Sequence, residues 1–149
     1  MSALFSRKKQ DKIDAFLSEY EKIQNAPQLA PNEINGLALT YHYKDVRIRA
    51  PYNLSGKYGE KSVAAIGARR GDMLTLVFDP RTVDGEKDPL NVAVMWKKTK
   101  IGDMRNNRMR DMVHEWRQAK LPIFCAMAYP APDRGFFLEF GFYGKPGKS

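Results

Sequence analysis

The chain has 149 residues, one cysteine, two histidines and a formal net charge of +8. This length suits a single domain that can bury a core without a disulfide or a structural metal. The lone cysteine excludes an intramolecular disulfide and a four-cysteine zinc site, while the excess of basic residues favours a polyanionic partner.

Residues 8–25 are predicted to form an amphipathic helix. The apolar side chains of Ile13, Phe16, Leu17 and Tyr20 recur at helical spacing, with charged residues on the other face. The prolines that follow stop the helix, so residues 26–35 are expected to form a linker. No stretch approaches the roughly 18 apolar residues of a membrane span, and the first residues lack the apolar core of a secretory signal. We therefore expect no membrane contact and a cytoplasmic location.

Strand patterns dominate the next part of the chain. Residues 37–43 and 46–50 alternate apolar and polar side chains, and Lys44-Asp45 between them is interpreted as a turn. Residues 52–59 read as a loop that is rich in polar residues.

Two apolar runs follow. Residues 73–78 predict a strand that Asp79-Pro80 ends, and an acidic loop then leads to Asp88-Pro89 and to a strand over residues 91–96. Alternating acids in this loop (Asp84, Glu86 and Asp88) are interpreted as an ordinary acidic turn rather than a metal site, because the glycine and the terminal glutamate of a calcium loop are absent.

The second predicted helix spans residues 104–119, with Asp103 as its N-cap. Its apolar stripe is Met109, Met112, Val113 and Trp116, and four arginines outside the stripe are expected to be exposed: Arg105, Arg108, Arg110 and Arg117. Both tryptophans, Trp96 and Trp116, are assigned to the core.

The chain is predicted to end in a hairpin of strands over 122–129 and 136–143, and Cys125 in its first strand is expected to be buried. Short adjacent strands favour a β-dominated α+β fold, a small open antiparallel barrel with one N-terminal and one internal helix. We assign residues 1–35 to the first helix and linker, 36–144 to the barrel domain and 145–149 to a flexible tail.

The most specific motifs lie between Gly71 and Gly102. They are the strand that ends in Asp79-Pro80, the segment Asp88-Pro89-Leu90-Asn91-Val92-Ala93-Val94, and the turn Lys100-Ile101-Gly102 before the second helix. In this order, over about residues 40–143, they resemble a HIRAN domain. The resemblance implies an OB-like barrel that grips single-stranded DNA at its 3′ end.

Such binding needs aromatic faces for unpaired bases, cations for phosphates, and an acceptor for a terminal hydroxyl. We therefore predict a nucleic-acid-binding module that prefers single-stranded DNA or DNA 3′ ends, in DNA repair or processing. No catalysis, cofactor or metal is expected, and a helicase or nuclease would come from a partner chain. The candidate binding residues are Arg47, Arg49, Tyr52, Lys57, Tyr58, Lys61, Asp88, Lys97, Lys98, Arg105 and Arg108.

Two other function classes stay open. One is a protein-interaction module whose basic face meets an acidic partner, and the other is a nuclease-like enzyme with a dispersed site that uses Asp84, Asp88 and His42. The sequence contains no phosphate-binding loop, no zinc-protease motif and no nucleophile elbow. Asp88 also has a purely structural interpretation, because an aspartate before proline commonly starts a turn.

Overall fold

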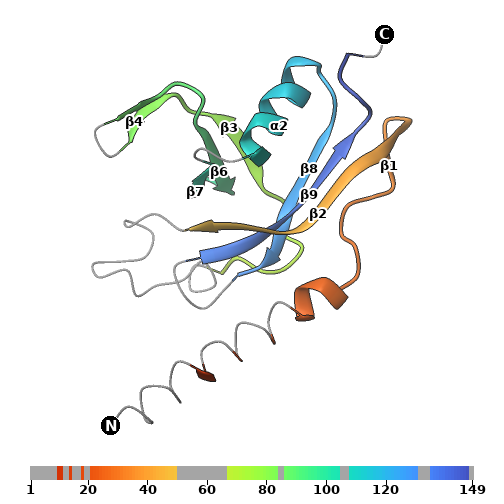
Figure 1. The fold of residues 1–149 in the computed structure, drawn as a ribbon, viewed down its shortest axis with the longest axis vertical. Helices are drawn as coiled ribbons and strands as arrows, with labels where there is room; N and C mark the ends of the chain where they lie inside the picture. The colour runs from red at the N-terminus through yellow and green to blue at the C-terminus, as the bar shows by residue number, and fades with distance from the viewer. Residues whose placement is uncertain are drawn as a thin grey trace.

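The computed structural model describes residues 10, 11, 14, 18, 21–49, 67–83, 86–104, 108–130 and 135–147. The described residues up to Asn25 are helical, and one further helix and nine strands follow within the described part. The predicted strand-dominated α+β fold is confirmed (Figure 1). The elements are β1 (Glu33–Ile34), β2 (Leu37–Arg49), β3 (Thr75–Phe78), β4 (Arg81–Val83), β5 (Glu86–Asp88), β6 (Val92–Trp96), β7 (Thr99–Met104), α2 (Arg108–Gln118), β8 (Ile123–Tyr129) and β9 (Gly135–Tyr143).

The described strands form three antiparallel sheets. The largest has the order β1-β2-β9-β8, the second β3-β6-β7, and the third is the hairpin β4-β5. Figure 1 shows the long strands β2, β8 and β9 crossing the middle of the molecule, with α2 between β8 and the three-stranded sheet. The two larger sheets meet at a bridge between Met73 and Ala126.

Strand β9 is buried on both faces. Successive side chains of a strand point to opposite sides of the sheet, so the residues of β9 fall into two sets. One set (Phe136, Leu138, Phe140 and Phe142) joins the main core with α2 and the three-stranded sheet. The other set (Phe137, Glu139, Gly141 and Tyr143) faces the opposite side and is buried as well. The sheet therefore needs a cover on its second face.

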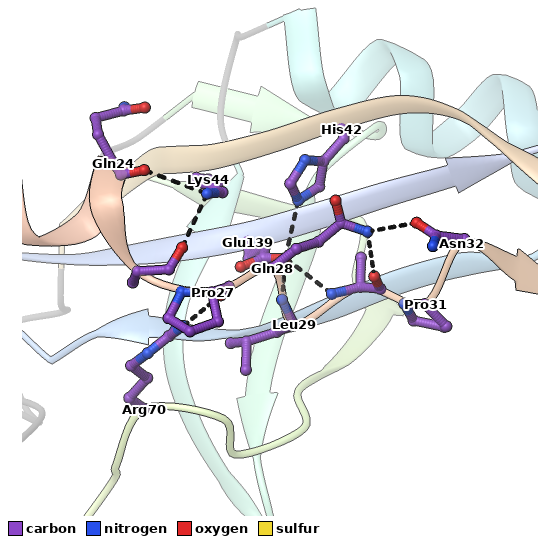
Figure 2. Close-up of polar contacts among 12 residues, drawn as sticks. Gln24, Pro27, Gln28, Leu29, Pro31, Asn32, His42, Lys44, Arg70 and Glu139 are labelled. Atoms are coloured by element: carbon purple, nitrogen blue, oxygen red, sulfur yellow. Dashed lines mark hydrogen bonds and ion pairs between the residues drawn. The ribbon is translucent and has the colours of Figure 1, made fainter.

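A segment that the sequence suggested was a linker provides this cover. We call residues 26–32 the strap; its Ala30 is buried against Ala126 and Tyr143. The carboxylate oxygen Oε2 of Glu139 accepts hydrogen bonds from the Leu29 and Ala30 N–H groups, each at 2.8 Å, and lies 2.8 Å from His42 Nε2 (Figure 2). A Cβ on Gly141 would lie 3.1 Å from that of Ala30, so only glycine allows this close approach without a shift.

Two cations also hold the strap and the residues just before it. Lys44 Nζ donates to the carbonyl oxygens of Gln24 at 3.3 Å and Ala26 at 2.9 Å, and Arg70 Nη2 donates to that of Pro27 at 2.6 Å. Figure 2 shows these donors and Glu139 grouped around the strap backbone. The strap is therefore part of the folded unit rather than a free connection.

Several predictions about elements are wrong. Lys44-Asp45 is no turn, because β2 runs through it with a register shift between Tyr43 and Val46 that absorbs the irregularity as a bulge. The supposed acidic loop contains the hairpin of β4 and β5. The end of the predicted linker also forms a strand, because β1 pairs with β2. Asn35 and Gly36, with φ of 52° and 80°, form the two-residue turn between them.

The second helix differs from its prediction at its start. Asp103 lies in β7 and does not cap the helix; its carboxylate accepts from Lys100 Nζ and Asn91 Nδ2 at 2.8 and 2.9 Å. Arg110 is buried rather than exposed, with 7% of its surface accessible, because a carboxylate from β5 meets it. Trp116 and Cys125 are buried as expected.

Candidate nucleic-acid interface

Two turns that are distant in sequence meet at the half-buried Trp96. One joins β6 to β7 and carries Lys97 and Lys98; the other spans residues 67–72 and carries Arg69. They are joined through Asp72, whose Oδ2 accepts from Trp96 Nε1 at 3.0 Å and from the Arg69 backbone N–H at 2.9 Å. We call Arg69, Asp72, Trp96, Lys97 and Lys98 the Trp96 cluster.

The turn between β6 and β7 directs lysine side chains into solvent. Trp96 pairs with Thr99, so only two residues make the connection, and Lys97 takes a φ of 54°. This left-handed region favours glycine or asparagine, so a lysine there is unusual. Backbone of this kind recurs at functional sites. The turn therefore places a pair of exposed cations, Lys97 and Lys98, at the tip of the β6–β7 hairpin.

Lys97 lies directly over the tryptophan. Its Nζ is 4.7 Å from the centroid of the Trp96 ring, which is within the range of a cation–π contact. The contact holds the ammonium beside one face of the ring. The ammonium covers this face, so a nucleobase that stacked on it would have to displace Lys97, whose charge would then be free to meet a phosphate.

Asp72 organises the cluster electrostatically. Its pKa is lowered from the ordinary value, first by the hydrogen bond from the Arg69 backbone and next by that from the Trp96 indole, with smaller effects from the positive charges of Lys97 and Arg69. The carboxylate therefore stays ionised at neutral pH and fixes the two turns. The cluster still holds three cations against one anion.

Basic residues from two distant parts of the chain thus lie in one place. Arg69 comes from the 67–72 turn, and Lys97 and Lys98 come from the turn between β6 and β7. Of the predicted binding residues, Lys97 and Lys98 take part in this cluster. Arg47 lies exposed on β2 and Arg108 lies exposed on the first turn of α2, each on a different element from the cluster.

Asp88 has a structural partner. Both of its carboxylate oxygens accept from Arg110 Nη1, at 2.9 and 3.0 Å, and Oδ1 also accepts from the Leu90 N–H at 3.3 Å. These bonds join β5 and the turn after it to α2. Its role as acceptor for a terminal hydroxyl remains a prediction, and the structure gives it a fold-holding role beside it.

The side chains of the remaining predicted binding residues lie outside the described part of the chain. Arg49 lies in β2 by its backbone, but its side chain is outside the described part. The others that fall outside the described residues are Tyr52, Lys57, Tyr58, Lys61 and Arg105, together with Asp84 of the alternative enzymatic site. His42 of that alternative site is bonded to Glu139 beneath the strap.

The cluster members Trp96, Arg69 and Asp72 were not among the predicted binding residues. Trp96 falls on the apolar pattern of a strand, and in the structure it packs against the main core while staying partly exposed. The signal that was present is the pair of lysines directly after an aromatic strand end, because a two-residue hairpin there must present both side chains.

No protein-family model, curated protein or solved structure matches the chain. The resemblance to a HIRAN domain therefore depends on the quoted motifs alone. Within the described part of the chain, no helix has the length and apolar character needed to cross a bilayer. Nor do three or more histidine, cysteine or acidic side chains gather there into a set that could hold a metal ion.

Proposed function

We propose that the chain binds single-stranded nucleic acid and that the Trp96 cluster is part of the binding surface. The observation that carries the proposal is the convergence of Arg69 and Lys97, from two distant turns, beside the half-buried ring of Trp96. Aromatic stacking is worth about 1–3 kcal/mol per base, and it tolerates any base sequence. The lysines supply phosphate contacts whose strength depends on salt.

The net charge of the whole chain supports a polyanionic ligand. At +8, the charge draws nucleic acid toward the surface before any specific contact forms. The resemblance to a HIRAN domain supports the finer proposal of an open OB-like barrel that prefers single-stranded DNA or its 3′ end. The bridge between Met73 and Ala126 supports the barrel, because it links the edges of the two larger sheets. In this proposal the chain works in the cytoplasm, in DNA repair or processing, beside a helicase or nuclease on another chain.

The proposal is tested by fluorescence anisotropy with a fluorescein-labelled 15-residue oligothymidylate between 50 and 300 mM salt. Each phosphate contact on a single strand adds about 0.7 to the slope of log affinity against log salt. The double variant Lys97→Ala/Lys98→Ala is therefore expected to lower the slope by about 1.4 and to weaken binding on the order of 25-fold at 0.1 M salt.

The matched control is Lys22→Ala/Lys145→Ala, which removes the same charge from exposed positions on other elements. If both double variants lose the same affinity, net charge alone drives binding and the Trp96 cluster is not the site. If the unmodified protein does not bind at 50 mM salt, the proposed function is wrong.

A further inference from the structure

The edges of the two larger sheets separate beside α2 and leave a cleft. Strands β3 and β8 are the edge strands of their sheets. Next to the bridge at Met73 they are bonded, with Gly71 N–H to Met127 C=O at 2.8 Å and Met127 N–H to Asp72 C=O at 2.8 Å. Beyond this point they diverge around a cleft with a volume of about 280 Å³.

Within the ranges that the structure describes, the backbone hydrogen bonds between these two edges stop at the pair Leu74 and Cys125, which forms one of its two expected bonds. In antiparallel pairing, two residues of a hydrogen-bonded pair exchange two N–H to C=O bonds. Leu74 N–H donates to Cys125 C=O at 3.0 Å, but the reciprocal bond from Cys125 N–H is absent among the hydrogen bonds of the described residues. The next pair, Leu76 and Ile123, forms no backbone bond across the cleft in this part of the chain.

The direction of the unused groups follows from the register. On β8 the carbonyls of Cys125 and Met127 point toward β3, so by alternation the N–H and C=O groups of Ile123 point the same way. On β3 the carbonyl of Leu76 points outward, where it accepts from Arg117 Nη1 at 3.3 Å, so the Leu76 N–H points outward too. Both walls of the cleft therefore present strand edges to each other.

The side chains inside the cleft and at its mouth indicate which side chains a bound segment would carry. Apolar side chains line its interior beside polar backbone, among them Val113, Leu121 and the neutral Cys125 thiol, whose pKa burial raises. Its mouth carries the exposed Arg117, and the exposed Lys120 directly precedes Leu121. An extended backbone would satisfy the edges, an apolar side chain would fill the cleft, and acidic neighbours would meet the cations.

We propose that the cleft between β3 and β8 binds an extended acidic peptide segment of a partner protein by strand addition. This interaction is independent of the nucleic-acid surface, since it uses other elements and needs backbone rather than phosphate. Arg117 acts as a movable cover, because it occupies the Leu76 carbonyl and lies over the Phe78 ring at 4.6 Å until the peptide displaces it.

The test uses a fluorescein-labelled peptide of four Glu-Val repeats and amide hydrogen exchange measured by NMR. Binding is expected to slow exchange at least tenfold at the amides of Leu76, Ile123 and Cys125. The amide of Phe124, which points toward β9, is expected to stay unchanged. Two control peptides, N-methylated at all valines or at all glutamates, keep the charge and lose the N–H groups of one edge.

Four results with the unmodified protein overturn the proposal: no binding at millimolar peptide, unchanged exchange at these amides, equal binding of the parent and both N-methylated peptides, or displacement by an equimolar oligothymidylate. Arg117→Glu is expected to weaken peptide binding at least tenfold. Arg108→Glu makes the same charge change on the first turn of α2 and serves as the matched control. If both variants bind the peptide equally, the cleft is not the site.

Discussion

Replacing Glu139 by glutamine tests how the strap is held. The carboxylate oxygen Oε2 takes three contacts of 2.8 Å, from the backbone N–H groups of Leu29 and Ala30 and from His42 Nε2, and the residue is 1% exposed. Glutamine keeps the shape and removes the negative charge. Hydrogen bonds to charged groups contribute about 1 kcal/mol more than neutral ones, so three of them lose roughly 3 kcal/mol. Release of the desolvation cost of the buried charge offsets part of this loss.

We therefore expect Glu139→Gln to lower the free energy of unfolding by about 2 kcal/mol, which corresponds to a fall in Tm of about 4–8 °C for a domain of this size. Urea unfolding followed by circular dichroism measures the first quantity. Hydrogen exchange at the amides of Leu29 and Ala30 reports on the strap itself, and these amides are expected to exchange faster.

The exposed Glu115 offers a matched control for the same chemical change. Glu115→Gln is expected to stay within about 0.5 kcal/mol of the unmodified protein. If Glu139→Gln is as stable as this control and Leu29 and Ala30 keep their protection, the carboxylate does not anchor the strap and the reasoning is wrong.

Two further predictions concern buried groups. Asp88→Ala removes the carboxylate that faces the buried Arg110, so urea unfolding is expected to show a loss of about 3 kcal/mol; a loss below about 1 kcal/mol would contradict the importance of this ion pair. Burial raises the pKa of the Cys125 thiol above its ordinary value of 9.0, so the thiol stays protonated in the folded chain while the unfolded chain ionises. Stability is therefore expected to fall by up to about 1.4 kcal/mol per pH unit as the pH rises past 9, relative to Cys125→Ala; parallel curves for the two proteins between pH 8 and 10.5 would exclude this effect.

The strands that sequence patterns predicted well are those made of apolar and β-branched residues. Strands β6, β8 and β9 lie close to their expected bounds, at residues 92–96, 123–129 and 135–143. Their apolar side chains favour burial, which makes the strand pattern clear in the sequence. Lys44-Asp45 was misinterpreted because two polar residues inside a strand look like a turn until the partner strand shows a bulge.

The buried charges were beyond reach of the pattern for a different reason. Arg110 lies off the apolar stripe of its helix, and only the position of Asp88, twenty-two residues earlier, makes its burial tolerable. Glu139 lies in an apolar strand, and the backbone that neutralises it comes from more than a hundred residues away. The partners of these buried charges come from distant parts of the chain, so the spacing of residues in the sequence does not predict them.

The members of the Trp96 cluster were predicted in part. Clustered basic residues made Lys97 and Lys98 candidates, and alternation assigned Trp96 to the core, against which it packs while its indole N–H reaches the Asp72 carboxylate. The convergence with Arg69 depends on how the 67–72 turn folds back on the hairpin. The sequence of neither segment indicates that the other lies beside it in the fold.

Attachment of the strap to the sheet determines where the smallest stable fragment of the chain can begin. The second face of β8 and β9 is covered by Ala30 and Leu29, and Ile23 from the preceding helix packs on Phe137 and Ala128. A truncation at residue 36, where the sequence alone places the start of the barrel domain, would leave this apolar face and the carboxylate of Glu139 open to water. Such a shortened chain is prone to self-association, whereas one that begins before Ile23 retains its lining.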